Sequence, residues 1–175
     1  MSILPQENGA TLEAFKAKTI DGAWLPEPWA TRLVQEGGAN VLVDEKDLWP
    51  GGQYVTTHLI VATKFLDAHP DVVKRLLEGQ VAANAYVNAN PADSQKIANA
   101  EIEQITQKRL SEAVIAAAWK NLTFTNDPVA SSLSQSAAAA QAIGLLKPVD
   151  LGGIYDLAPL NEVLRSVGET EVEDA

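Results

Sequence analysis

The order of apolar and polar positions divides the chain near Ala62 into two parts of different character. Before Ala62, short apolar runs alternate with amphipathic segments. After Ala62, apolar residues recur at close to a 3.6-residue period over long stretches. The pattern therefore predicts alternating helices and strands first and mainly helices afterwards, which indicates an α/β fold.

Short apolar runs predict the strands. The longest of them, residues 54–62, is rich in β-branched and aromatic side chains and is bounded by a Gly-containing loop. We expect strands at residues 20–25, 41–43, 54–62 and 122–125.

Helical periodicity and end signals predict seven helices. Pro28 and Pro70 stand at helix starts, Gly37-Gly38 and Gly144 follow helix ends, and Ser111 can cap a helix that runs to Trp119. In the helix at 93–108 we expect Ile97, Ile102 and Ile105 to form the buried stripe. The expected helices are a short one ending near Lys18, one from Pro28 to Gly37, and residues 71–87, 93–108, 111–119, 127–144 and 159–167.

Composition narrows the classes of partner. The 175 residues are 46% apolar and 21% charged, as in a soluble domain, and the net charge of −10 disfavours nucleic acid and anionic membrane surfaces. The chain has no cysteine and two histidines, so thiolate chemistry is excluded and a His-rich metal site is not expected. We expect neither a metal nor a cofactor.

No motif predicts catalysis. The sequence contains no phosphate-binding loop, dinucleotide fingerprint, H-E-x-x-H pair or G-x-S-x-G elbow. The serine-rich residues 131–136 fall on the polar side of an amphipathic helix, where a solvated face explains them. We therefore do not expect an enzyme.

A candidate ligand site lies at the predicted strand-to-helix turn around Trp24, Glu27 and Trp29. Open α/β sheets bind ligands at such turns, and the N-terminus of a helix beginning at Pro28 suits an anion. Both tryptophans fit core packing as well, so the two interpretations stay open. Glu27 would repel an anion unless it caps the helix or pairs with a basic group.

Several segments resemble one protein family. Residues 15–34 (FKAKTIDGAWLPEPWATRLV), 39–57, which include DEKDLWPGG at 44–52, and 65–73 (FLDAHPDVV) are similar, in order and spacing, to motifs of the aliphatic sulfonate, nitrate and taurine solute-binding proteins of ABC importers. The similarity runs from about Leu12 to about Leu164.

The resemblance implies part of a two-lobed α/β fold, the type 2 periplasmic-binding-protein fold. Residues 1–52 would end the second lobe, 53–168 would form the hinge return and the helical C-terminal part of the first lobe, and 169–175 an acidic tail. From the hinge region the resemblance adds Tyr54, Thr56 and His58 to the ligand-binding residues. For a histidine within a strand, a structural hydrogen bond is the alternative interpretation.

In function, the resemblance implies a carrier of small organic anions such as sulfonates, taurine or nitrate. Its partner would be an ABC-transporter membrane permease, and the full-length protein would be periplasmic or lipid-anchored outside the cytoplasm. The family's export signal and first-lobe sheet have no counterpart here, so we expect an N-terminally truncated chain. Its exposed strand edges predict a homodimer or low stability.

Two alternatives remain. One is an enzyme that resembles the pyrimidine-forming synthase of thiamine biosynthesis, which shares the fold, although the absence of cysteine argues against it. The other is a ligand-sensing interaction module, although no DNA-binding helix-turn-helix is evident.

Overall fold

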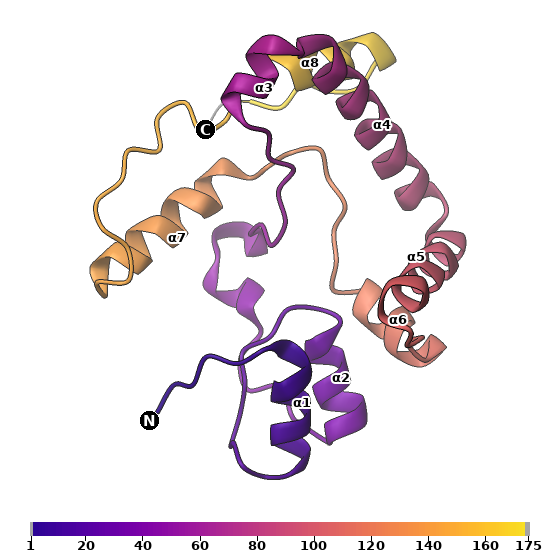
Figure 1. The fold of residues 1–175 in the computed structure, drawn as a ribbon, viewed down its shortest axis with the longest axis vertical. Helices are drawn as coiled ribbons and strands as arrows, with labels where there is room; N and C mark the ends of the chain where they lie inside the picture. The colour runs from indigo at the N-terminus through magenta and orange to yellow at the C-terminus, as the bar shows by residue number, and fades with distance from the viewer. Residues whose placement is uncertain (1, 174–175) are drawn as a thin grey trace. The chain divides into compact units, whose positions relative to one another are not determined.

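The computed structural model describes residues 2–173, and within them it contains eight α-helices, two short 3₁₀-helices and no strand (Figure 1). The helices predicted from periodicity and end signals are confirmed, with shifts of a few residues at their ends, and α3 was not predicted. They are α1 (Asn8–Lys16), α2 (Trp29–Gly37), α3 (Thr63–Ala68), α4 (Pro70–Ala89), α5 (Pro91–Thr106), α6 (Glu112–Trp119), α7 (Ala130–Ala142) and α8 (Ala158–Val167), with 3₁₀-helices at Glu45–Leu48 and Pro50–Gly52.

The α/β prediction is wrong. Residues 20–25, 41–43, 54–62 and 122–125 do not form strands, and no described segment forms a ladder with them. A strand depends on hydrogen bonds and side-chain packing from a neighbouring strand, so an apolar run without one stays unpaired. The exposure of these runs agrees with this: Leu42 is 96% and Ile60 is 86% exposed.

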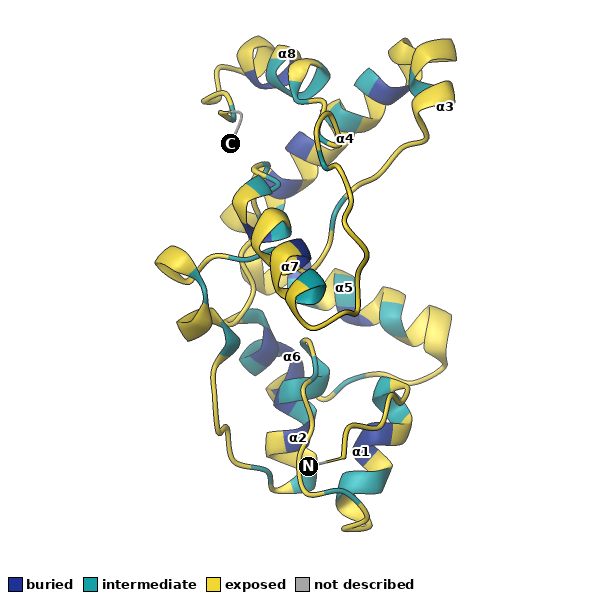
Figure 2. Cartoon of the chain, turned by 90° about the vertical axis from the view of Figure 1, so that its left-hand side faces the viewer, coloured by how far each residue is buried: buried dark blue, intermediate teal, exposed yellow. Residues whose placement is uncertain are grey.

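The chain divides into two compact units. The first unit covers the described part of Met1–Val43 together with Asn90–Thr123. In it, α1 packs against α2, α2 against α6, and α5 against α6. Buried apolar side chains of α1, α2 and α6 form its interior: Leu12, Leu33, Val114, Ile115 and Ala118. Figure 2 shows buried stretches of α1 and α6 in dark blue.

Polar side chains set the helix boundaries of the first unit. Ser111 Oγ accepts a hydrogen bond from the Val114 amide at 3.2 Å, which confirms the predicted cap of α6. Buried Asn99 exchanges two hydrogen bonds with the backbone of Leu110, at 2.9 and 3.0 Å. The Asn99 side chain thus satisfies both backbone polar groups of Leu110 and fixes the segment between α5 and α6.

The stripe expected in α5 is largely wrong. Ile97 and Ile105 are 52% and 78% exposed, Ile102 is half-buried, and the buried positions are Ser94 and Asn99. Periodicity identifies an apolar face, but it does not determine how much of that face the neighbouring helix α6 covers.

The second unit covers Asp44–Ala89 and the described part of Phe124–Ala175. Here α4 packs against α8 and against α3. Its core consists of Val81, Val163 and Leu164, with Val172 packed against them. Asn161 exchanges two hydrogen bonds with the Val172 backbone, at 2.9 and 2.8 Å, so the acidic C-terminal segment is held in place as far as this position.

Candidate functional site

The predicted turn before α2 is organised by Glu27. Its carboxylate accepts hydrogen bonds from the Thr31 amide (3.2 Å), the Thr31 hydroxyl (3.0 Å) and Asn121 Nδ2 (2.6 Å). Glu27 therefore satisfies one of the free N–H groups in the first turn of α2, that of Thr31, and links α2 to the residues after α6. The helix N-terminus that we considered for an external anion is occupied by a carboxylate of the chain itself.

The two tryptophans of this turn differ in their surroundings. Trp24 is 62% exposed, whereas Trp29 is half-buried and carries the Arg32 guanidinium 4.5 Å from its ring centroid. Arg32 also makes two hydrogen bonds to Glu36, at 2.8 and 3.0 Å, and these bonds hold the pKa of Glu36 below its ordinary value. In α1, a Cβ added to Gly9 would lie 3.5 Å from the Trp29 ring, so this ring fills space next to α1.

The segment between the 3₁₀-helix Pro50–Gly52 and α3 contains the other three predicted ligand-binding residues, Tyr54, Thr56 and His58. The Tyr54 ring stacks on Trp49, with centroids 5.5 Å apart and planes 15° from parallel. Thr56 is exposed. Among the three residues, Thr56 is the one whose side chain faces solvent.

His58 ties three segments of the second unit together. Its Nε2 lies 3.1 Å from the Pro128 carbonyl oxygen and 3.1 Å from the Tyr155 hydroxyl. A carbonyl oxygen only accepts, so Nε2 carries the proton that it donates to Pro128. Burial raises the pKa of Tyr155. His58 therefore makes structural hydrogen bonds, as in the alternative interpretation of this residue.

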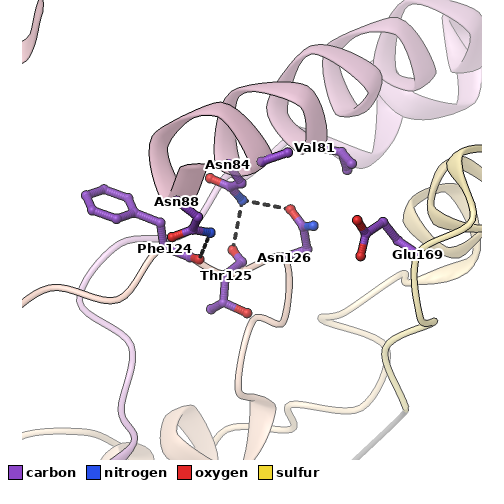
Figure 3. A pocket seen from close by; sticks show the side chains of 8 residues that line it. Val81, Asn84, Asn88, Phe124, Thr125, Asn126 and Glu169 are labelled. Carbon is purple, nitrogen blue, oxygen red and sulfur yellow. Dashed lines mark hydrogen bonds between the residues drawn. The ribbon is translucent and has the colours of Figure 1, made fainter. Parts of the chain in front are cut away.

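A polar pocket in the second unit was not predicted from the sequence. It has a volume of about 230 Å³. The sequence feature that could have indicated it is the spacing of residues 81, 84, 85 and 88, which places them on one face of α4. Figure 3 shows this face opposite the segment after Thr123, with Glu169 at the side. The lining residues are Val81, Asn84, Ala85, Asn88, Phe124, Thr125, Asn126 and Glu169.

Asparagines build the wall of this pocket. Asn84, which is 8% exposed, donates from Nδ2 to the Thr125 carbonyl (3.0 Å) and to Asn126 Oδ1 (2.7 Å). One helical turn further, Asn88 Nδ2 donates to the Phe124 carbonyl at 2.9 Å. These bonds hold residues 124–126 along α4.

Over residues 2–173, no group of three or more His, Asp or Glu side chains is placed to hold a metal ion. Among the helices of this part of the chain, none is both long and apolar enough to cross a membrane.

Comparison with known proteins assigns the chain to a family. A model of the NMT1-like family matches residues 2–102, more than half of the 175 residues. The chain belongs to the NMT1-like family. This family is related to the sulfonate- and nitrate-binding periplasmic proteins, so the resemblance found in the motifs is confirmed at this level. Searches of curated proteins and of solved structures found no match to this chain.

Membership in the NMT1-like family indicates a protein of solute-binding type, in a family composed mostly of non-enzymatic binding proteins. Members of the family are typically extracytoplasmic. The matched range includes all six predicted ligand-binding residues: Trp24, Glu27, Trp29, Tyr54, Thr56 and His58.

Proposed function

We propose that the protein is the solute-binding component of an ABC importer for aliphatic sulfonates or related small organic anions, such as taurine or nitrate. The observation that carries this proposal is the family match over residues 2–102. The protein would act outside the cytoplasm and deliver its ligand to a membrane permease.

Within the predicted residues, the contacts favour different roles. Trp24 and Thr56 are exposed, so a ligand can reach them, and we assign ligand contact to these two. Glu27 and His58 are engaged by the polar groups of their own units, so we assign them the role of positioning residues. Trp29 and Tyr54 pack against Arg32 and Trp49 and would present a ring edge at most.

Calorimetric titration of the protein with a panel of alkanesulfonates, taurine and nitrate tests the proposal. Saturable binding of one of these anions is the expected result, and Trp24→Ala and Thr56→Ala should each weaken it. Thr57→Ala is the matched control for Thr56→Ala, because Thr57 is the neighbouring exposed threonine. Absence of binding by a folded sample, or equal effects of Thr56→Ala and Thr57→Ala, would contradict the proposal.

We propose in addition that two copies of the chain associate. The support is the exposed apolar run at residues 59–61, where Leu59 is 54%, Ile60 86% and Val61 42% exposed. Unpaired extended backbone with apolar side chains is a template for pairing with another strand. Light scattering coupled to gel filtration should detect a dimer that Ile60→Lys weakens. A monodisperse monomer with a cooperative, high-temperature melt would refute it.

A further inference from the structure

The pocket on α4 leaves specific polar groups unused, and these determine which ligand it accepts. The Thr125 carbonyl oxygen can only accept, so the Asn84 atom facing it is the amide nitrogen. Asn84 Oδ1 in turn accepts from Gln80 Nε2 at 3.1 Å, which fixes the same orientation from the other side.

The orientation of Asn84 decides that of Asn126. Because Asn84 donates to Asn126, the Asn126 atom at 2.7 Å is Oδ1, and its amide nitrogen is turned away from α4. Figure 3 shows this nitrogen and the Glu169 carboxylate on facing sides of the pocket. Within the described residues, the Asn126 amide nitrogen donates no hydrogen bond, and the Glu169 carboxylate accepts none and forms no ion pair.

The charge of the lining excludes one class of ligand. Glu169 is the only ionisable side chain among the eight lining residues, and none of them is Lys, Arg or His. A bound anion would meet the carboxylate without a compensating positive charge, whereas a cation with N–H donors would satisfy it. The pocket therefore differs in chemistry from the anion site proposed above.

The volume sets the size of the ligand. At about 230 Å³ the pocket is smaller than the roughly 300–1,000 Å³ of sites that hold drug-sized molecules. A molecule of a few non-hydrogen atoms fits this space.

We propose that this pocket binds a small primary amine that also carries an oxygen acceptor. The ammonium group donates to the Glu169 carboxylate, and the oxygen accepts from the Asn126 amide nitrogen. The asparagines of α4 contribute by fixing the direction in which Asn126 donates.

Three near-isosteric probes test the charge requirement: ethanolamine, ethylene glycol and glycolate, which are cationic, neutral and anionic. Each is titrated into the ¹⁵N-labelled protein while the Asn126 side-chain amide resonance is followed, which is assigned by its loss in Asn126→Asp. Ethanolamine should shift this resonance saturably, with a dissociation constant on the order of a millimolar, because so few atoms gain little binding energy. The two other probes should cause no saturable shift.

Variants test the role of the carboxylate. Glu169→Gln retains the shape and removes the charge. Because Glu169 is exposed, the variant should weaken ethanolamine binding by about two- to fivefold, as expected for loss of a solvent-exposed ion pair. Glu173→Gln is the matched control, with the same charge change in the same segment outside the lining, and it should bind as the unmodified protein does.

A pocket that binds glycolate as well as ethanolamine, or that binds none of the probes, overturns the proposal. Equal effects of Glu169→Gln and Glu173→Gln overturn it too, since they would indicate only a change in net charge. Alkanesulfonates and nitrate carry no amine, so their binding tests the proposed function, whereas ethanolamine binding tests this pocket. The two proposals therefore fail independently.

Discussion

Replacement of Glu27 by alanine tests how the first unit is held together. The carboxylate serves a donor in the first turn of α2, the Thr31 hydroxyl and the Asn121 amide. Because Thr31 is only 7% exposed, its hydroxyl would lose its partner in a place that water reaches poorly. The Asn121 bond is exposed and contributes less.

The expected loss follows from these contacts. An unsatisfied buried hydroxyl costs about 1–3 kcal/mol, and a lost helix cap costs about 0.5–2 kcal/mol. Together they predict that Glu27→Ala lowers the free energy of unfolding by about 1.5–5 kcal/mol, or Tm by about 3–20 °C for a chain of this length. Glu27→Gln keeps one oxygen acceptor, so its free energy of unfolding should fall by about 1 kcal/mol, between the values of the unmodified protein and of Glu27→Ala.

Urea unfolding followed by far-UV circular dichroism measures the effect. Glu101→Ala is the matched control, since Glu101 is an exposed carboxylate on α5 in the same unit and forms no hydrogen bond or ion pair among the described residues. It should change stability by no more than about 0.5 kcal/mol. If Glu27→Ala and Glu101→Ala unfold at the same urea concentration, the contacts of Glu27 with Thr31 and Asn121 do not stabilise the first unit.

Three further predictions concern stability. Asn161→Ala removes both hydrogen bonds that clamp the C-terminal segment, so unfolding free energy should fall by about 1–2 kcal/mol and amide exchange in that segment should rise. The hydrogen bonds from Arg32 lower the pKa of Glu36 below its ordinary value, so their contribution to the free energy of unfolding is present above that ordinary value and is lost as the pH falls through the lowered pKa. Urea unfolding should show the protein and its Glu36→Gln variant converging in acid. Leu12→Ala should lower the free energy of unfolding by about 2–5 kcal/mol because Leu12 is 1% exposed, whereas Leu42→Ala, at 96% exposure, should change it by no more than about 0.5 kcal/mol in thermal melts; equal losses would contradict the assignment of the core.

The sequence alone determined the helices other than α3. Their signals are local: the 3.6-residue period, a serine at the start of α6, and a glycine that follows α2 in the left-handed conformation, with φ of 72°. The motifs around Trp24 and Glu27 identified the family, because order and spacing of residues are properties of the sequence itself.

Tertiary structure decided everything that depends on a partner distant in sequence. Residues 54–62 have strand composition, but no described segment pairs with them, and pairing is what makes a strand. The link from Glu27 to the residues after α6 depends on Asn121, 94 residues later, and the pocket depends on Asn84 meeting residues 125 and 126. A local pattern contains the propensity of each segment but not the surface against which it will pack, so these contacts became known only with the fold.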